Sequence, residues 1–243
     1  MSPDEPRAET RPQSVSLWED YVDIFYAPSQ VFARRESGNF WIPLLVVTVL
    51  FGLLWLASAR VLGPVFDAEW DRQLRRMMER NPQTPVEQLE AGRAMVQRFQ
   101  ALSVLFIVPV TIFLVGFVLW GVGKIFEAQQ TVRSALVVAA FAYMPRVVER
   151  ALVMVEGIFR DVSAIDGQNR LTWGVGRFLD PDTIAPTLLA VLMRIDLFTI
   201  WVTVLLAIGL AVTGKIGRQR AAIAGVLMWL IGAIPTFFAM LRA

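Results

Sequence analysis

The sequence contains no cysteine and no histidine among its 243 residues. Without cysteine the chain has no disulfide, thiolate nucleophile, iron–sulfur cluster or cysteine zinc site. Without histidine it has no imidazole base and no histidine-ligated metal or haem, which excludes Ser-His-Asp hydrolases and zinc proteases. Because only carboxylates, lysine, tyrosine and hydroxyls remain for catalysis, we expect a non-enzymatic protein with no catalytic residues, no metal and no cofactor.

Charged residues are also scarce, since they make up 18% of the chain against about 25% in soluble domains. Hydrophobic residues account for 56%, and the mean hydropathy is +0.53, which is typical of a membrane protein. Only Lys124 and Lys215 are lysines among 23 basic residues, a usage common in GC-rich bacterial genomes. The arginines alternate with acidic residues rather than clustering, so we expect no nucleic-acid binding.

Long apolar stretches define the fold class. A transmembrane helix needs about 20 mostly apolar residues to cross about 30 Å of hydrocarbon. Five stretches of the chain approach or exceed this length: 40–62, 99–122, 134–158, 196–213 and 221–241. They predict an all-α, polytopic membrane helix bundle with about five transmembrane helices plus interfacial and extramembrane helices. Residues 1–39 are polar and contain no recognisable signal peptide.

Basic residues beside the spans predict the orientation. On one side of a five-span bundle they are Arg34, Arg35, Lys124, Arg133, Lys215, Arg218 and Arg220. The loops on the other side hold more arginine in total, but they are longer and also acidic. We therefore expect a multi-pass protein of the cytoplasmic (inner) membrane, with its N-terminus in the cytoplasm and its C-terminus outside.

The longer segments outside the predicted spans have predicted structures of their own. Residues 1–14 are rich in proline and charge and predict a disordered tail. Region 15–39 begins with a capping box and predicts an amphipathic helix, which packs on the protein's own spans or lies on the membrane. Segment 64–98 predicts a charged extramembrane helical hairpin, and 160–194 a loop followed by an interfacial or re-entrant helix. Region 15–39 and the hairpin are candidate surfaces for another membrane or cytoplasmic protein, or simply solvated faces.

The third predicted span carries a stripe of charges. Arg146, Glu149, Arg150 and Glu156 share one face of a helix, because they follow i, i+3, i+4 spacing. An arginine at the bilayer centre costs at least about 2.5–3.5 kcal/mol, so these groups must pair, face the bundle or lie near the interface. Pro145 precedes them and predicts a helix kink, because proline lacks a backbone N–H.

Two hypotheses account for this stripe. In one, a polar cleft binds a lipid head group or small anion, with Arg146 and Arg150 as donors and Glu149 and Glu156 as orienting ion-pair partners. In the other, the crossing ends near Arg146 and the arginine side chains snorkel to the interface. Asp196 is predicted separately as the N-cap of the fourth span.

Short motifs along the chain carry a family resemblance. They are Pro-x-x-Val-Phe at 28–32, Trp-Ile-Pro at 41–43, Tyr-x-Pro at 143–145, Asp-Leu-Phe-Thr-Ile-Trp at 196–201 and Trp229 in the last span. Over about 15–241 the chain resembles the bacterial branch of the Yip-domain family, relatives of the eukaryotic Ypt/Rab-interacting membrane proteins. The resemblance implies a five-span integral membrane protein with a cytoplasmic N-terminus and no catalytic residues. The hairpin 64–98 departs from the family pattern by its length.

These observations predict a membrane-organising or scaffold protein in contact with membrane lipids. A transport-class protein, such as a permease subunit or a small-solute channel, is the alternative. Transporters are typically built from inverted repeats with paired broken helices. Five dissimilar spans with one proline-interrupted helix fit that pattern less well than the scaffold prediction. No oligomeric state follows from the sequence.

Overall fold

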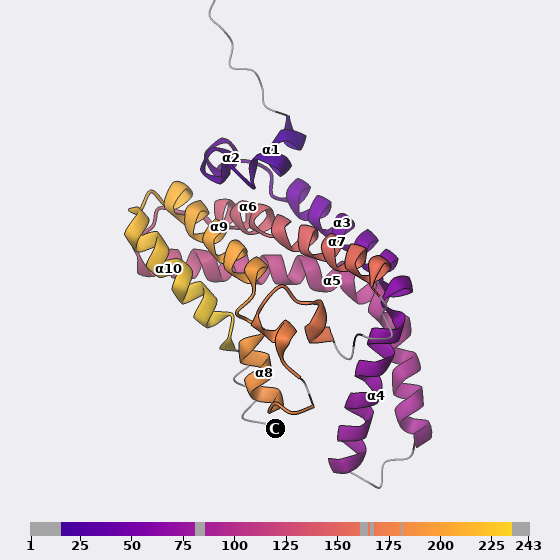
Figure 1. Cartoon of the computed structure of the whole chain (residues 1–243). Helices are drawn as coiled ribbons and strands as arrows, with labels where there is room; N and C mark the ends of the chain where they lie inside the picture. Colours follow the sequence, from indigo (N-terminus) through magenta and orange to yellow (C-terminus); the bar gives the residue numbers. More distant parts are fainter. Residues whose placement is uncertain (1–15, 81–85, 161–164, 166–167, 181, 235–243) are drawn as a thin grey trace, which may run out of the picture.

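The computed structural model describes residues 16–80, 86–160, 165, 168–180 and 182–234. Over these ranges the chain is mainly helical and forms no β-strand, which confirms the all-α prediction (Figure 1). The helices are α1 (Leu17–Asp23), α2 (Pro28–Arg35), α3 (Trp41–Val61), α4 (Gly63–Arg80), α5 (Val86–Ile125), α6 (Val132–Ala142), α7 (Met144–Phe159), α8 (Pro186–Leu192), α9 (Leu197–Gly214) and α10 (Arg218–Ile231), with 3₁₀ turns η2 (Gln168–Leu171) and η3 (Val175–Phe178). The predicted tail 1–14 and the end of the last predicted span, 235–241, lie outside the described residues.

In the described part of the chain, three helices are long and apolar enough to cross a membrane. They are α3, the Ser103–Ile125 part of α5, and α9. The predicted span 134–158 is divided into α6 and α7 at Tyr143, because Pro145 has no N–H to donate to the carbonyl of Phe141. Helix α10 is described over 14 residues. A membrane protein is therefore supported, while the count of about five spans stays a prediction.

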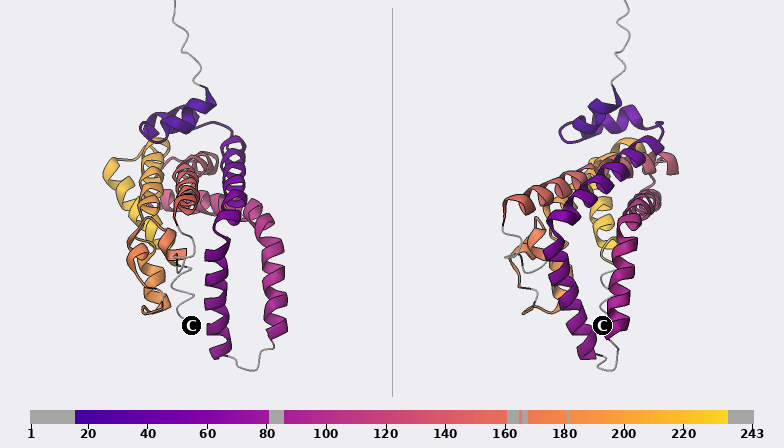
Figure 2. Two further views of the ribbon diagram at one scale, coloured as in Figure 1. Left: turned by 45° about the vertical axis from the view of Figure 1, so that its right-hand side comes forward. Right: turned by 90° about the vertical axis from the view of Figure 1, so that its right-hand side faces the viewer.

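Helices α4 and α5 form two neighbouring arms that project away from the rest of the bundle, on the side opposite α1 and α2 (Figure 2). Helix α5 is 40 residues long and contains Pro109, and it bends between the arm and the bundle. The α4 arm also contacts the loop before α8, where Nε of Arg72 donates to Oδ1 of Asp182 at 2.9 Å. This ion pair joins residues that are 110 positions apart.

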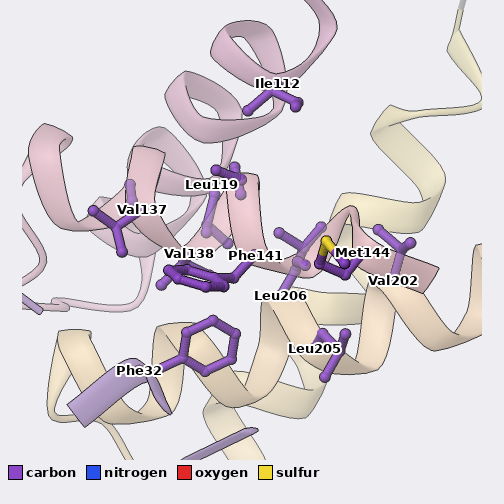
Figure 3. Close-up of a cluster of buried hydrophobic side chains, with 14 of the residues drawn as sticks. Phe32, Ile112, Leu119, Val137, Val138, Phe141, Met144, Val202, Leu205 and Leu206 are labelled. Atoms are coloured by element: carbon purple, nitrogen blue, oxygen red, sulfur yellow. The ribbon is translucent and has the colours of Figure 1, made fainter. Parts of the chain in front are cut away.

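Helix α6 lies at the centre of the bundle and packs against α3, α5 and α9. All of its residues from Ser134 to Ala142 are buried. Figure 3 shows Phe32 of α2 beside Phe141 and Val138 of α6 in this core. Small residues allow close helix contacts, as in other membrane bundles. At Gly209 of α9 an added Cβ would lie 2.2 Å from Cγ1 of Val138.

The N-terminal helices lie on the bundle through α2, which packs against α9 and α6. Val31 and Phe32 of α2 are fully buried. Asp20 of α1 is also fully buried and accepts from Nη2 of Arg34 at 2.8 Å and from Nε of Arg35 at 2.5 Å. Ion pairing therefore holds α1 against α2, while the apolar side of α2 covers the core.

Tyr21 gives a stability prediction for this N-terminal region. Its hydroxyl is buried and has no hydrogen-bond partner in the described part of the chain. Burial, with a smaller contribution from Asp20, raises the pKa of Tyr21 to about 12. Because the unfolded tyrosine ionises near pH 10, the stability from a neutral Tyr21 is complete below pH 10 and is lost as the pH rises toward 12.

Tyr21→Phe is therefore expected to raise the free energy of unfolding by about 1 kcal/mol at pH 8. Between pH 10 and pH 12 the free energy of unfolding should also decrease less in this variant than in the wild-type protein. Thermal unfolding followed by circular dichroism in detergent measures both effects. Tyr26→Phe is the matched control, because the Tyr26 hydroxyl is exposed and donates to Asp23 at 2.8 Å. A Tyr21→Phe protein that is less stable than wild type would contradict the prediction.

Candidate functional site

Arg146 connects the start of α7 with the start of α9. Its Nη1 donates to Oε2 of Glu149 at 2.6 Å and lies 3.5 Å from Oδ1 of Asp196, and its Nη2 donates to Oγ1 of Thr199 at 2.6 Å. The sequence placed Arg146 and Glu149 on one helix face. The contacts with Asp196 and Thr199 come from residues about 50 positions away, which helix periodicity could not identify.

Asp196 is the N-cap of α9 and also a partner of Arg146. Its backbone is extended, and its Oδ1 accepts from the backbone N–H of Thr199 at 2.8 Å and from the Thr199 hydroxyl at 3.1 Å. The residue is 3% exposed, and its Oδ2 has no hydrogen-bond partner among the residues described. Asp196 thus supplies a buried negative charge where α7 and α9 begin.

The loop between α7 and α8 is fixed against Asp196 by a short backbone pairing. The N–H of Val175 donates to the Ile195 carbonyl at 3.0 Å, and the N–H of Leu197 donates to the Trp173 carbonyl at 3.1 Å. Between them, a Cβ on Gly174 would lie 2.2 Å from the Ile195 oxygen and 2.7 Å from the Asp196 Cα. Only glycine can occupy position 174, because the loop backbone packs directly against the backbone of the α9 N-cap.

A pocket of about 200 Å³ lies between α3, α4, α7 and η2. Arg146, Glu149 and Arg150 supply its charged lining, and Thr172 supplies a hydroxyl. Nε and Nη2 of Arg150 are buried without a hydrogen-bond partner in the described ranges. The guanidinium lies 4.4 Å from the centre of the Trp55 ring, a cation–π contact that holds it in place.

Pro145 and Glu156, also predicted as site residues, have other positions. Pro145 lies in the first turn of α7, and the helix interruption precedes it at Tyr143. Glu156 pairs with Arg160 at 2.5 Å and with Arg177 of η3, and it does not line the pocket. The charged face is therefore divided: Arg146, Glu149 and Arg150 border the pocket, while Glu156 holds the loop.

Arg194 is a further residue near the site that sequence reasoning missed. Its Nη1 and Nη2 donate to the carbonyls of Gly232 and Trp229 at 2.7 and 2.8 Å, at the end of α10. Burial, and to a lesser degree the charge of Arg146, lower the pKa of Arg194. Because Arg194 lies two residues before Asp196, its hydrogen bonds connect the site to the end of α10.

The site combines charges of both signs. The N-termini of α7 and α9 carry partial positive charge, and Arg146 and Arg150 add two full charges beside Glu149 and Asp196. Because Arg146 is already bonded to three side chains, Arg150 is the residue with donors to offer. In the described part of the chain, no group of three or more acidic residues is placed to hold a metal ion.

Comparison with protein families shows that residues 22–240 match the Yip1 domain. Comparisons with curated proteins and with solved structures gave no match. The matched range includes α2 to α10 and every residue of the pocket, and it confirms the resemblance drawn from the sequence motifs. Together with three helices apolar enough to cross a membrane, this match shows that the chain belongs to the Yip1 domain family of integral membrane proteins.

Proposed function

We propose that this Yip1 family protein is a non-enzymatic, membrane-organising scaffold that binds an anionic lipid head group, or a free anion of the same chemistry, at the pocket beside Arg150. The observation that carries the proposal is the Arg150 guanidinium, whose Nε and Nη2 are buried without a hydrogen-bond partner in the residues described. A buried donor without a partner costs about 1–3 kcal/mol, more when charged. A phosphate oxygen at this position would offset that cost.

The neighbouring residues have supporting roles in this proposal. Trp55 positions Arg150 through its ring face, and Arg146 is oriented by Glu149 and Asp196. The pocket volume of about 200 Å³ is below the 300–1,000 Å³ typical of sites for drug-sized molecules. It therefore suits a phosphate-sized group rather than a whole lipid molecule.

Thiol labelling can test the pocket directly, because the chain has no cysteine. A single cysteine placed by Thr172→Cys lines the pocket, and its labelling by a water-soluble maleimide should slow when inorganic phosphate or glycerol phosphate is added. Arg150→Gln should weaken this protection at least about tenfold, because hydrogen bonds to charged groups contribute about 1.5–3 kcal/mol. Protection by glycerol phosphate alone would indicate a lipid head group, and equal protection a free anion.

Two controls accompany this measurement. Arg60→Gln removes the same charge from an exposed position of α3 outside the pocket, and it should leave protection unchanged. A cysteine at exposed Gln73 of α4 should react at a rate that phosphate does not alter. If phosphate protects Thr172→Cys to the same extent with and without the Arg150→Gln substitution, the proposed role of Arg150 is wrong.

We also propose that the protein lies in the cytoplasmic membrane with its N-terminus inside and its C-terminus outside. The basic residues near the ends of α2, α5 and α9 support this orientation. In this arrangement α1 and α2, or the α4–α5 hairpin, would present surfaces to other membrane or cytoplasmic proteins. Tags at the two ends of the chain should report opposite sides, and tags on the same side would refute the proposed orientation.

A transport function is the second candidate, and the interruption of α6–α7 at Tyr143 favours it. Interrupted helices beside charged groups form the substrate sites of many transporters. Uptake of labelled inorganic phosphate into proteoliposomes separates the two candidates. A scaffold should give no uptake above that of empty liposomes, whereas a transporter should give uptake that Arg150→Gln reduces.

A further inference from the structure

A second and larger concavity lies between α9 and α10, away from the Arg150 pocket. Its volume is about 770 Å³, and it is an open groove bordered at one side by Pro28 and Ser29 of α2. Apart from Ser29, Thr203 and Arg218, its lining consists of apolar side chains and glycine. The Thr203 hydroxyl donates to the Thr199 carbonyl at 2.8 Å, so the groove offers almost no polar group along its length.

Small residues form much of the lining of this groove. Ala207 and Ala211 of α9 face Ala221, Ala222 and Gly225 of α10 across its floor and walls. The helices touch there, because a Cβ on Gly225 would lie 3.0 Å from the Cβ of Ala207. From Arg218 to Trp229 the groove follows α10 over eleven residue-to-residue steps, or about 17 Å at 1.5 Å per step. This length corresponds to about one leaflet of a hydrocarbon core that is about 30 Å thick.

Cations lie near both ends of the groove, and the two ends differ in the partners of these cations. Arg218, the first residue of α10, is the one charged residue in the lining among the residues that the structure describes. Within the described ranges neither Arg218 nor nearby Lys215 makes an ion pair, whereas Arg220 lies 3.5 Å from Glu127. At the opposite end, the Arg194 guanidinium lies 5.4 Å from the centre of the Trp229 ring, but its Nη1 and Nη2 already donate to the carbonyls of Gly232 and Trp229. Among the described residues, the groove thus has cations without an ion-pair partner at its Arg218 end, a cation already bonded to carbonyls at its Trp229 end, and an apolar length between them.

We propose that the α9–α10 groove binds an acyl chain of an anionic phospholipid, with the lipid phosphate beside Arg218 and Lys215. The apolar length matches the chain, and the two cations match the head group. This site is distinct from the pocket at Arg150, because the two share no lining residue. A helix from a second copy of the protein is the competing occupant, but it would leave the charges of Arg218 and Lys215 without a counterpart.

Photo-crosslinking tests the lipid. Full-length protein is placed in nanodiscs that contain phosphatidylglycerol or phosphatidylcholine with a photoactivatable acyl chain, and labelled peptides are identified by mass spectrometry. We expect the α9 and α10 peptides to be labelled about fivefold more by the anionic probe, and Arg218→Gln to remove this preference. Arg220→Gln is the matched control, because it removes the same charge from the same turn without touching the lining.

A second pair of variants tests the groove itself. Ala222→Trp fills the groove from an exposed wall position, whereas Ile223→Trp adds a tryptophan at an exposed position outside the lining. Only Ala222→Trp should reduce labelling of α9 and α10, again by about fivefold, if it displaces the chain. Gel filtration and circular dichroism of both variants separate this effect from misfolding.

Three outcomes would overturn the proposal. The first is equal labelling of α9 and α10 by the two probes, and the second is unchanged labelling of these helices in well-folded Ala222→Trp. The third is an Ala222→Cys protein that forms disulfide-linked dimers on oxidation and shows no acyl-chain labelling. The last result would place a second copy in the groove. Arg150→Gln should leave labelling of α9 and α10 unchanged, so failure of the head-group pocket and failure of the groove can be told apart.

Discussion

Arg146→Ala is expected to destabilise the protein by about 3–5 kcal/mol, the largest effect of any single substitution considered. The side chains of Glu149 and Asp196 are 18% and 4% exposed, and both would lose their cation. The Thr199 hydroxyl would lose a donor at 2.6 Å as well. The buried carboxylate of Asp196 and the partly buried carboxylate of Glu149 would then lie close together, so the start of α7 should separate from the start of α9. Unfolding of the detergent-solubilised protein, followed by circular dichroism, measures the change.

Two further variants serve as controls for this prediction. Arg60→Ala removes an arginine from an exposed position of α3 and should change stability by less than about 0.5 kcal/mol. The double variant Arg146→Ala/Glu149→Ala should be more stable than the Arg146→Ala protein, because it also lacks one of the two carboxylates left without a cation. If the double variant is the less stable of the two, the ion-pair explanation is wrong.

Gly209→Ala is expected to destabilise the bundle by about 1–3 kcal/mol. The added Cβ would lie 2.2 Å from Cγ1 and 2.9 Å from Cγ2 of Val138. Val138 is β-branched and fully buried, so it has one favoured rotamer and no free space into which to turn. Helices α6 and α9 would have to separate, which a lower midpoint of thermal unfolding should report.

A compensating substitution makes this second prediction specific. In a Val138→Ala background the two interfering methyl carbons are absent, so Gly209→Ala should cost much less there than in the wild-type protein. Gly121→Ala is the control within the membrane helices, since a Cβ at Gly121 meets no atom within 4 Å. Equal losses in both backgrounds would show that the α6–α9 contact does not set the effect.

Local sequence signals predicted most of the helical architecture. The apolar runs predicted α3 and α9 closely, because lipid-facing and core-facing residues are both hydrophobic. Ser16 and Asp196 accept from backbone N–H groups at the starts of α1 and α9, where the sequence placed helix starts. The interruption at Tyr143 was expected only as a kink at Pro145, since proline marks a disturbed helix without fixing its geometry.

Helix periodicity predicted only those contacts of the candidate site that form within one helix. The i, i+3 spacing of Arg146 and Glu149 corresponds to their bond of 2.6 Å. The same spacing could not separate Glu156 from the pocket, because its partner Arg177 comes from an irregular loop. Nor could it place Trp55 against Arg150, since that contact depends on how α3 packs against α7.

The ion pair between Arg72 and Asp182 has a topological consequence. Two touching, charged residues outside the hydrocarbon must lie on the same side of a bilayer, so the chain between them crosses it an even number of times. If α5 makes one crossing, a second must follow before Asp182, and α6 with α7 is the one helical segment in the described part of that interval that can make it. On these conditions the parity of crossings requires α6 together with α7 to traverse the bilayer, as the apolar stretch 134–158 predicts, although neither helix alone is long and apolar enough to do so.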